Sequence, residues 1–209
     1  MEEKAESIED RVDSAVGVLD EHESMDESAE RIAPKDETSN YAAASKYASV
    51  EGALAVIYHI NKETRETEFY FETKSPNYSF TDYVGKNALV GGVIDPTDKS
   101  PLEALVREFG EEIQEEGARI LEKIARNNTE PCYIGEHEDG GVNVRDYVFK
   151  LEVKDDDEWE TVKNSKMTND AGYRTILTRD DIVKSDNSDW AFNHYSLISK
   201  FVNDNYRGK

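Results

Sequence analysis

The chain has 209 residues, of which 37% are hydrophobic and 34% are charged, and its formal net charge is −21. This length is enough for one good-sized domain with an extension. No apolar run approaches the length needed to cross a bilayer, and the strong negative charge disfavours broad binding to DNA or RNA backbones. Cys132 is the only cysteine, which excludes an internal disulfide and a cysteine-based zinc site.

Residues 1–49 differ in composition from the rest of the chain, because acidic residues are dense there and no aromatic residue occurs before Tyr41. The first residues are acidic and fit neither a secretory signal nor a transit peptide, so we expect a cytoplasmic protein. A thin apolar stripe over residues 8–19 is typical either of a helix that docks on a partner or a second subunit, or of a marginal terminal helix. We therefore predict an acidic, partly helical or disordered extension over residues 1–49, and a homodimer stays open.

The folded domain is expected over residues 50–209, beginning with a hairpin. Residues 53–60 form a nearly continuous apolar run, which predicts a buried strand, and residues 67–74 alternate and are rich in aromatics, which predicts its partner. A loop is expected over residues 75–86, and a short strand over residues 87–90 then leads into the glycine pair Gly91-Gly92.

A helix is predicted to begin after this glycine pair. Ser100 is a good N-cap, and Pro101 fits the first helical position, where no backbone donor is needed. An apolar face recurs at helical spacing and comprises Leu102, Leu105, Val106, Phe109 and Ile113. We expect this helix to run on to Gly117.

Three glutamates, Glu108, Glu111 and Glu112, share a different face of the same helix. Like charges at this spacing repel one another by a few tenths of a kcal/mol per pair. A hard divalent cation turns that repulsion into attraction, and Mg²⁺ prefers oxygen ligands and often binds substrate phosphates as well. A helix whose acids are merely solvated is the simpler interpretation of such a charged face, but it does not account for the preceding glycine pair.

The segment resembles the Nudix box, through Gly92, Asp98, Arg107-Glu108 and Glu111-Glu112. It departs from the pattern in three places: Asp98 replaces a glutamate, one extra residue lies between Asp98 and Arg107, and Gln114 stands in place of the second glycine. A lone R-E-x-x-E-E is a weak signal. Combined with the glycine pair, the helix start and the apolar face, it is strong.

The resemblance implies a Nudix-like α/β/α sandwich with a mixed sheet, in addition to the acidic extension. The remaining residues agree with this fold class, because strands flank a central helix and a second helix lies near the C-terminus. In chain order we predict helix end or strand over 120–125, a strand and an acidic loop within 130–141, a strand over 142–153, irregular structure over 155–170, a strand over 173–177, a capped helical turn over 178–183 and an amphipathic helix over 190–202.

The resemblance also implies a reaction, the hydrolysis of a nucleoside diphosphate linked to another group, with Mg²⁺ as cofactor and Mn²⁺ as its alternative. Carried over from the box, Glu108, Glu111 and Glu112 (the box acids) are the metal ligands, with a backbone carbonyl of Gly92. Arg107 is expected to orient the acids, and Glu103, four residues before it on the same helix, is expected to pair with it. The catalytic base is either a box glutamate, Glu108, or an acid on a distant loop. For the loop we name Glu138, although an ordinary exposed turn explains residues 136–139 equally well.

A nucleobase needs aromatic planes to stack on, and Tyr78, Phe80 and Tyr83 lie in the loop before the box. Aromatic residues in a loop are at least as often a lid on the core. The expected partner is a small nucleotide substrate, with no membrane and no long nucleic acid. Two alternatives remain: a non-catalytic nucleotide-binding or protein-interaction module on the same fold, and an interaction protein whose function lies in residues 1–49. His59 and His194 are expected to be core residues.

Overall fold

The computed structural model describes residues 49–139, 142–168 and 172–206. The predicted extension therefore lies outside the described residues except for Ser49, which already belongs to the first strand. The strands are β1 (Ser49–Ile60), β2 (Thr67–Lys74), β3 (Asn87–Ala88), β4 (Val90–Val93), β5 (Tyr133–Asp139), β6 (Val142–Glu152) and β7 (Gly172–Thr178). The helices are α2 (Pro101–Glu112), α3 (Glu115–Arg126), α4 (Asp156–Asn164), α5 (Arg179–Lys184) and α6 (His194–Tyr206). Two 3₁₀ turns cover Thr81–Tyr83 and Asn187–Asp189.

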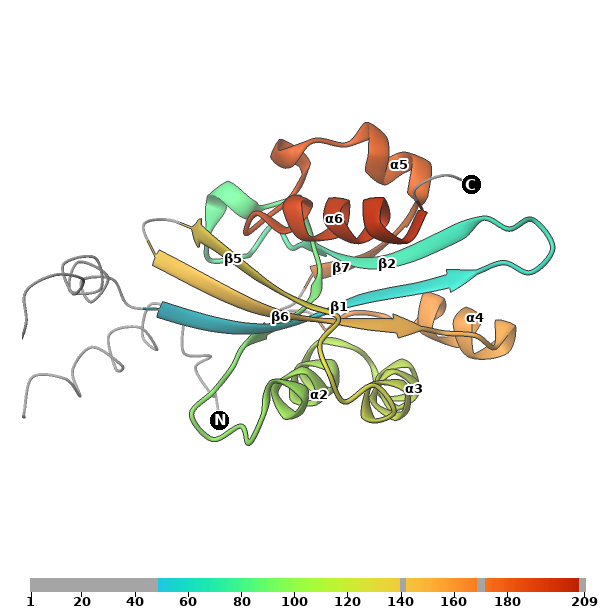
Figure 1. The fold of residues 1–209 in the computed structure, drawn as a ribbon, viewed down its shortest axis with the longest axis horizontal. Helices are drawn as coiled ribbons and strands as arrows, with labels where there is room; N and C mark the ends of the chain where they lie inside the picture. The colour runs from blue at the N-terminus through green and yellow to red at the C-terminus, as the bar shows by residue number, and fades with distance from the viewer. Residues whose placement is uncertain (1–48, 140–141, 169–171, 207–209) are drawn as a thin grey trace, which may run out of the picture. The chain divides into compact units, whose positions relative to one another are not determined.

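The strands form one seven-stranded mixed sheet with β1 at its centre. Its order is β3-β2-β1-β6-β5, with β4 paired to β1 and β7 paired to β2. β1 runs antiparallel to β2 and β4 and parallel to β6. Figure 1 shows α2, α3 and α4 on one face of the sheet and α5 and α6 on the other, so the predicted α/β/α sandwich with a mixed sheet is confirmed.

β1 is apolar at successive positions because helices cover both faces of the sheet. Its side chains alternate between the two faces, so those of residues 53–59 are all buried. Ala53, Ala55 and Ile57 pack with α2, α3 and α4 in one core cluster. Leu54 and Val56 belong to a second cluster with α6. Val90 of β4 belongs to the first cluster, so this packing positions the strand that carries the glycine pair.

The box helix is shorter than predicted, because it ends at Glu112 instead of Gly117. A distant segment supplies the backbone hydrogen-bond partners there. Thr168 donates its N–H to the carbonyl of Glu112 at 2.8 Å, and Gln114 donates its N–H to the carbonyl of Lys166 at 3.0 Å. Gln114 then becomes the N-cap residue of α3. Residues 120–125, left open between helix end and strand, are helical.

Two further predictions about local structure are wrong. Within the segment 155–170, which was expected to be irregular, residues 156–164 form α4, which begins after an N-cap Asp155 that accepts two backbone N–H groups and which buries Trp159 and Val162. The acidic loop expected within residues 130–141 is mostly strand β5, an edge of the sheet that pairs with β6.

The C-terminal helix starts later than predicted, at His194 instead of Trp190. Phe192 and Asn193 have φ values of 53° and 56°, in the left-handed region that a right-handed helix cannot include. His59 and His194 are buried, as expected of core residues. Within the described part of the chain, none of the helices is both long and apolar enough to span a membrane.

Candidate active site

Strand β4 places the glycine pair directly against the centre of the sheet. Gly91 has a φ of 130°, and a Cβ atom on it would collide with the carbonyl oxygen of Ala53. Gly92 lies opposite Ala53 in the β1–β4 register. A side chain at Gly91 is therefore excluded by the backbone of β1, which explains why the sequence has glycine there.

Two of the box acids lie against this pair. A Cβ atom on Gly92 would stand 2.6 to 3.0 Å from the carboxylate atoms of Glu108. Glu112 accepts a hydrogen bond from the N–H of Gly91 at 3.3 Å. The apolar face of α2, in which Leu105 and Phe109 are fully buried, fixes the helix so that its acidic face points toward β4.

The two glycines should respond differently to alanine, which is the first prediction. Gly91→Ala forces a strained φ and a clash with backbone, so we expect a loss of about 1–3 kcal/mol or more in the free energy of unfolding. Gly92→Ala meets only the end of the flexible Glu108 side chain, so the fold should survive while the carboxylate moves and turnover falls. Urea denaturation and a hydrolysis assay on both variants check this; a Gly92→Ala protein with normal turnover would contradict it.

Arg107 connects the acids to the loop before the helix. Its Nη1 lies 2.7 Å from Glu108 Oε1 and 3.0 Å from Glu111 Oε2. Its Nη2 donates to the carbonyl of Val93 at 2.9 Å and to Asp98 Oδ2 at 3.1 Å. One guanidinium thus bridges the glycine strand, the loop and two box acids, an arrangement in which its rigid planar fork is well suited to orient carboxylates.

The neighbours of Arg107 differ from the sequence-based expectation in one respect. Glu103, expected to pair with Arg107, instead forms an exposed ion pair with Arg126 at 3.1 Å. The reason is that Arg107 already has acidic partners on the loop side of α2. Glu103 therefore lies outside the arginine-centred network.

The surroundings of two acids in this region shift their pKa values in opposite directions. Burial and the nearby Glu72 carboxylate raise the pKa of Glu112 well above its usual range. Burial alone would also raise the pKa of Asp98, but hydrogen bonds from Arg107 and from the backbone of Asp95 hold it below its usual range. The charged form is thus disfavoured for Glu112 and favoured for Asp98.

Within residues 49–139, 142–168 and 172–206, no three His, Cys, Asp or Glu side chains are gathered closely enough to hold a metal ion. The box acids are instead divided between two partners, since Arg107 holds Glu108 and Glu111, and Gly91 donates to Glu112. Carboxylates repel one another unless positive charge lies between them, and in this arrangement Arg107 supplies that charge.

The proposed base and a neighbouring acid lie on the β5–β6 hairpin. Glu138 is exposed on β5, opposite Asn143 in register. Asp146 of β6 was not singled out from the sequence, yet it is buried. A Cβ atom on Gly52 would collide with Asp146 Oδ1 and would lie 3.6 Å from the carbonyl oxygen of Gly92. The only signal for it in the sequence is its place directly before the apolar run Tyr147-Val148-Phe149.

The aromatic residues of the loop before the box lie next to a buried ion pair. Lys74 pairs with the fully buried Glu72 at 2.6 Å, and its ammonium lies 4.8 Å from the centre of the Tyr78 ring. Tyr78 and Phe80 are in the loop, and Tyr83 ends the 3₁₀ turn. The ring centre of Phe192, a residue that no sequence motif marks, lies 4.4 Å from that of Tyr83.

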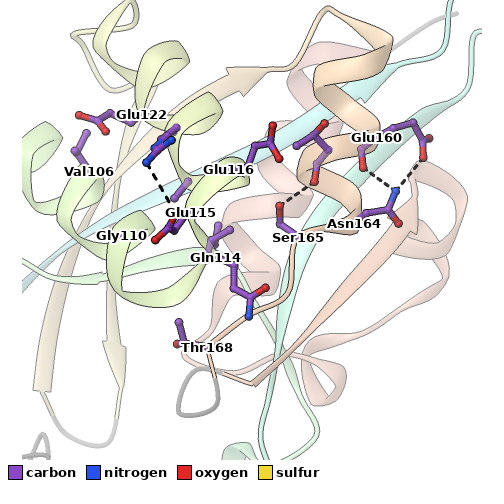
Figure 2. A pocket seen from close by; sticks show the side chains of 14 residues that line it. Val106, Gly110, Gln114, Glu115, Glu116, Glu122, Glu160, Asn164, Ser165 and Thr168 are labelled. Atoms are coloured by element: carbon purple, nitrogen blue, oxygen red, sulfur yellow. Dashed lines mark hydrogen bonds and ion pairs between the residues drawn. The ribbon is translucent and has the colours of Figure 1, made fainter.

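A separate hollow of about 1090 Å³ lies between the end of α2, α3 and α4 (Figure 2). Val106 and Gly110 line it from α2, and helical spacing puts them on the side of α2 opposite Glu108 and Glu112. Its other labelled residues include Glu115 and Glu160. This hollow is therefore not part of the site formed by the glycine pair and the box acids.

Several solved structures share this fold. A MutT protein from Methanosarcina mazei Go1 matches with a TM-score of 0.54 and 19% identity, over 78% of this chain and 99% of its own. A mutT/nudix family protein from Listeria innocua matches with a TM-score of 0.51 and 15% identity, over 74% and 92%. A possible asymmetric diadenosine tetraphosphate hydrolase from Jonesia denitrificans DSM 20603 matches with a TM-score of 0.52 and 12% identity, over 74% and 93%. At these identities the similarity establishes the fold alone.

The sequence itself matches the model of the NUDIX domain over residues 55–198. A comparison with curated proteins finds no match. The family match and the box motif together define the class, a Nudix-type pyrophosphohydrolase. The chain belongs to the Nudix family, as the resemblance of its box predicted.

Proposed function

We propose that this protein hydrolyses the pyrophosphate bond of a small nucleoside diphosphate derivative, with Mg²⁺ or Mn²⁺ bound by the box. The observation that carries the proposal is the convergence of the box on the glycine pair, with the Glu108 carboxylate against Gly92 and Glu112 on the N–H of Gly91. Nudix enzymes generally use a divalent metal.

The donor chemistry of these residues suits such an ion, although in this structure Arg107 and Gly91 hold the three acids apart. Carboxylate and carbonyl oxygens are the ligands that hard cations prefer. Burial and the neighbouring Glu72 carboxylate raise the pKa of Glu112 and so disfavour its charged form, which a bound cation would favour. Glu108, Glu111, Glu112 and the carbonyl of Gly92 would hold it. When bound, a divalent ion neutralises phosphate oxygens and lowers the pKa of a water ligand.

The chain's own residues would then divide the remaining work. Arg107 orients Glu108 and Glu111 through its two contacts with them. Glu108 or Glu138 takes the proton of the attacking water, and the position of Asp146 near the carbonyl of Gly92 makes it a further candidate for that role. Tyr78, Phe80 and Tyr83 bind the nucleobase by stacking.

The proposal is tested by a substrate panel. One structural neighbour is described as a possible diadenosine tetraphosphate hydrolase, so dinucleoside polyphosphates belong in the panel with oxidised nucleotides and nucleotide sugars. Purified protein should release a nucleoside monophosphate from at least one of them, and a chelator should stop the reaction. Nucleotide binding without any hydrolysis would favour a non-catalytic binding module.

The acidic extension is expected to be dispensable for this chemistry, which is the second prediction. Strand β1 begins at Ser49, and the family match begins at residue 55. A chain lacking residues 1–45 should keep the melting temperature and the turnover of the full chain. If it loses its fold or most of its turnover, the extension contributes to the core or to a dimer interface.

A further inference from the structure

Four aromatic rings from two distant segments form a closed cycle next to the box. Neighbouring ring centres are 5.9 Å apart for Tyr78 and Phe80, 6.3 Å for Phe80 and Tyr83, 4.4 Å for Tyr83 and Phe192, and 6.2 Å for Phe192 and Tyr78. All four side chains are only partly buried. Phe192, the one member from the C-terminal segment, closes the cycle through its contacts with Tyr78 and Tyr83. We call these four residues the aromatic cluster.

The backbone holds Phe192 in a conformation that bulky residues rarely adopt. Phe192 and Asn193 are both left-handed, with φ of 53° and 56°, and such conformations persist only where the surrounding structure holds them. The flanking residues provide that support: Ala191 donates to the carbonyl of Asn87 at 2.9 Å, and His194 Nδ1 accepts the N–H of Leu89 at 3.0 Å. Burial lowers the pKa of His194 to about 3, so its ring is neutral and able to accept.

The same contacts connect this turn to the box. Leu89 immediately precedes β4, the strand that carries the glycine pair. The turn at Phe192 thus holds the strand of the glycine pair on one side and contributes a ring to the aromatic cluster on the other. Backbone strain kept in this way is typical of functional positions.

The charge around the aromatic cluster indicates which ligand it suits. Lys74 lies 4.8 Å from the centre of Tyr78 and 5.4 Å from that of Phe192, and Lys86 lies 5.9 Å from that of Tyr83. Lys74 is already neutralised by its ion pair with Glu72 at 2.6 Å, so Lys86 is the cation that could meet a phosphate. The rings favour a planar group such as a base, and Lys86 favours an anionic substituent on it.

We propose that Phe192 is a specificity-determining residue that completes a nucleobase-stacking surface with Tyr78, Phe80 and Tyr83. This inference rests on the proposed function, since it assumes a nucleotide substrate. Its content is separate, because it assigns the recognition of the base to a residue outside both the box and the loop before it.

The test compares ligands that differ only in the base. Binding of the four nucleoside 5′-monophosphates and of ribose 5-phosphate is measured by calorimetry for the native chain, for Phe192→Ala and for Phe192→Leu. The native chain should bind at least one monophosphate more tightly than ribose 5-phosphate. Loss of one stacking partner should weaken that monophosphate about tenfold in both variants, since stacking contributes about 1–3 kcal/mol per base, and should leave ribose 5-phosphate unchanged.

Tyr173→Ala is the matched control, because Tyr173 is 61% exposed on β7 and its loss should change neither affinity. Phe192→Leu keeps apolar volume, so it preserves the test if the alanine variant does not fold. The inference is overturned if no monophosphate binds better than ribose 5-phosphate, or if the Phe192 variants bind both ligands as the native chain does. Metal-dependent hydrolysis by the native chain in either case would leave the proposed function standing.

Discussion

Replacing Glu108 by Gln is expected to lower turnover by orders of magnitude while the protein remains folded. Gln keeps the size of the side chain and its hydrogen bonding but removes the charge that a hard cation needs. The same result is expected for Glu111→Gln and Glu112→Gln. Folding should be preserved, and in Glu112→Gln it should be slightly improved, because that change relieves the repulsion between Glu112 and the Glu72 carboxylate.

Glu103 provides the control on the same helix. It pairs with Arg126 at the surface, where ion pairs contribute about 0–1 kcal/mol, so Glu103→Gln should cost little activity. Steady-state kinetics over a Mg²⁺ titration compares the four variants. Equal losses in Glu103→Gln and Glu108→Gln would show that the effect is not specific to the box acids.

Replacing Lys74 by Met is expected to lower the free energy of unfolding by about 3–5 kcal/mol, as breaking a buried ion pair usually does. Glu72 is fully buried and bonds to the Lys74 ammonium at 2.6 Å. Without Lys74, a buried carboxylate is left beside Glu112, another acid. The double variant Glu72→Gln, Lys74→Met should recover most of the loss, which urea denaturation of the single and double variants measures.

This deficit should also depend on pH. Burial raises the pKa of Glu72 above the ordinary value of 4.5, and removing Lys74 raises it further. A carboxyl with a raised pKa in the folded state binds more protons there than in the unfolded state, so its contribution to stability falls as pH rises. The Lys74→Met deficit should therefore shrink as pH falls from neutral toward 4.5. A deficit that is constant over this range would contradict an uncompensated charge at Glu72.

Local patterns were sufficient for most of the fold. The apolar run of β1, the alternation of β2 and the cap at Ser100 predicted their elements, because each depends on neighbouring residues alone. The end of the box helix could not be predicted in this way. It ends at Glu112 because residues 166–168 pair with it across the fold, and no local signal records such a contact. The sequence does contain two signals for α4, a possible cap at Asp155 and the large apolar side chain of Trp159. The acidic composition of the segment outweighed them.

In the candidate site, too, local spacing was predictive and contacts across the fold were not. Spacing along one helix placed the box acids on one face, but it could not decide between Glu103 and the loop acid Asp98 as partners of Arg107. Phe192 was missed because an amphipathic pattern was extended through it, whereas its left-handed backbone ends that pattern. Asp146 and the carbonyl of Gly92 lie on either side of Gly52 only because β1 pairs with both β6 and β4, and the spacing of residues along one strand does not predict such a pairing.

The most direct test of a metal site in the box is Mn²⁺ binding measured by electron paramagnetic resonance, at an ionic strength that screens diffuse attraction to an acidic surface. The native chain and Glu103→Gln should bind Mn²⁺ with the same affinity, and Mg²⁺ should compete with it. Glu108→Gln and Glu112→Gln should each bind it much more weakly and lose the increase in melting temperature that added metal produces. If Glu108→Gln binds Mn²⁺ as the native chain does and is stabilised by it to the same extent, the box is not the metal site.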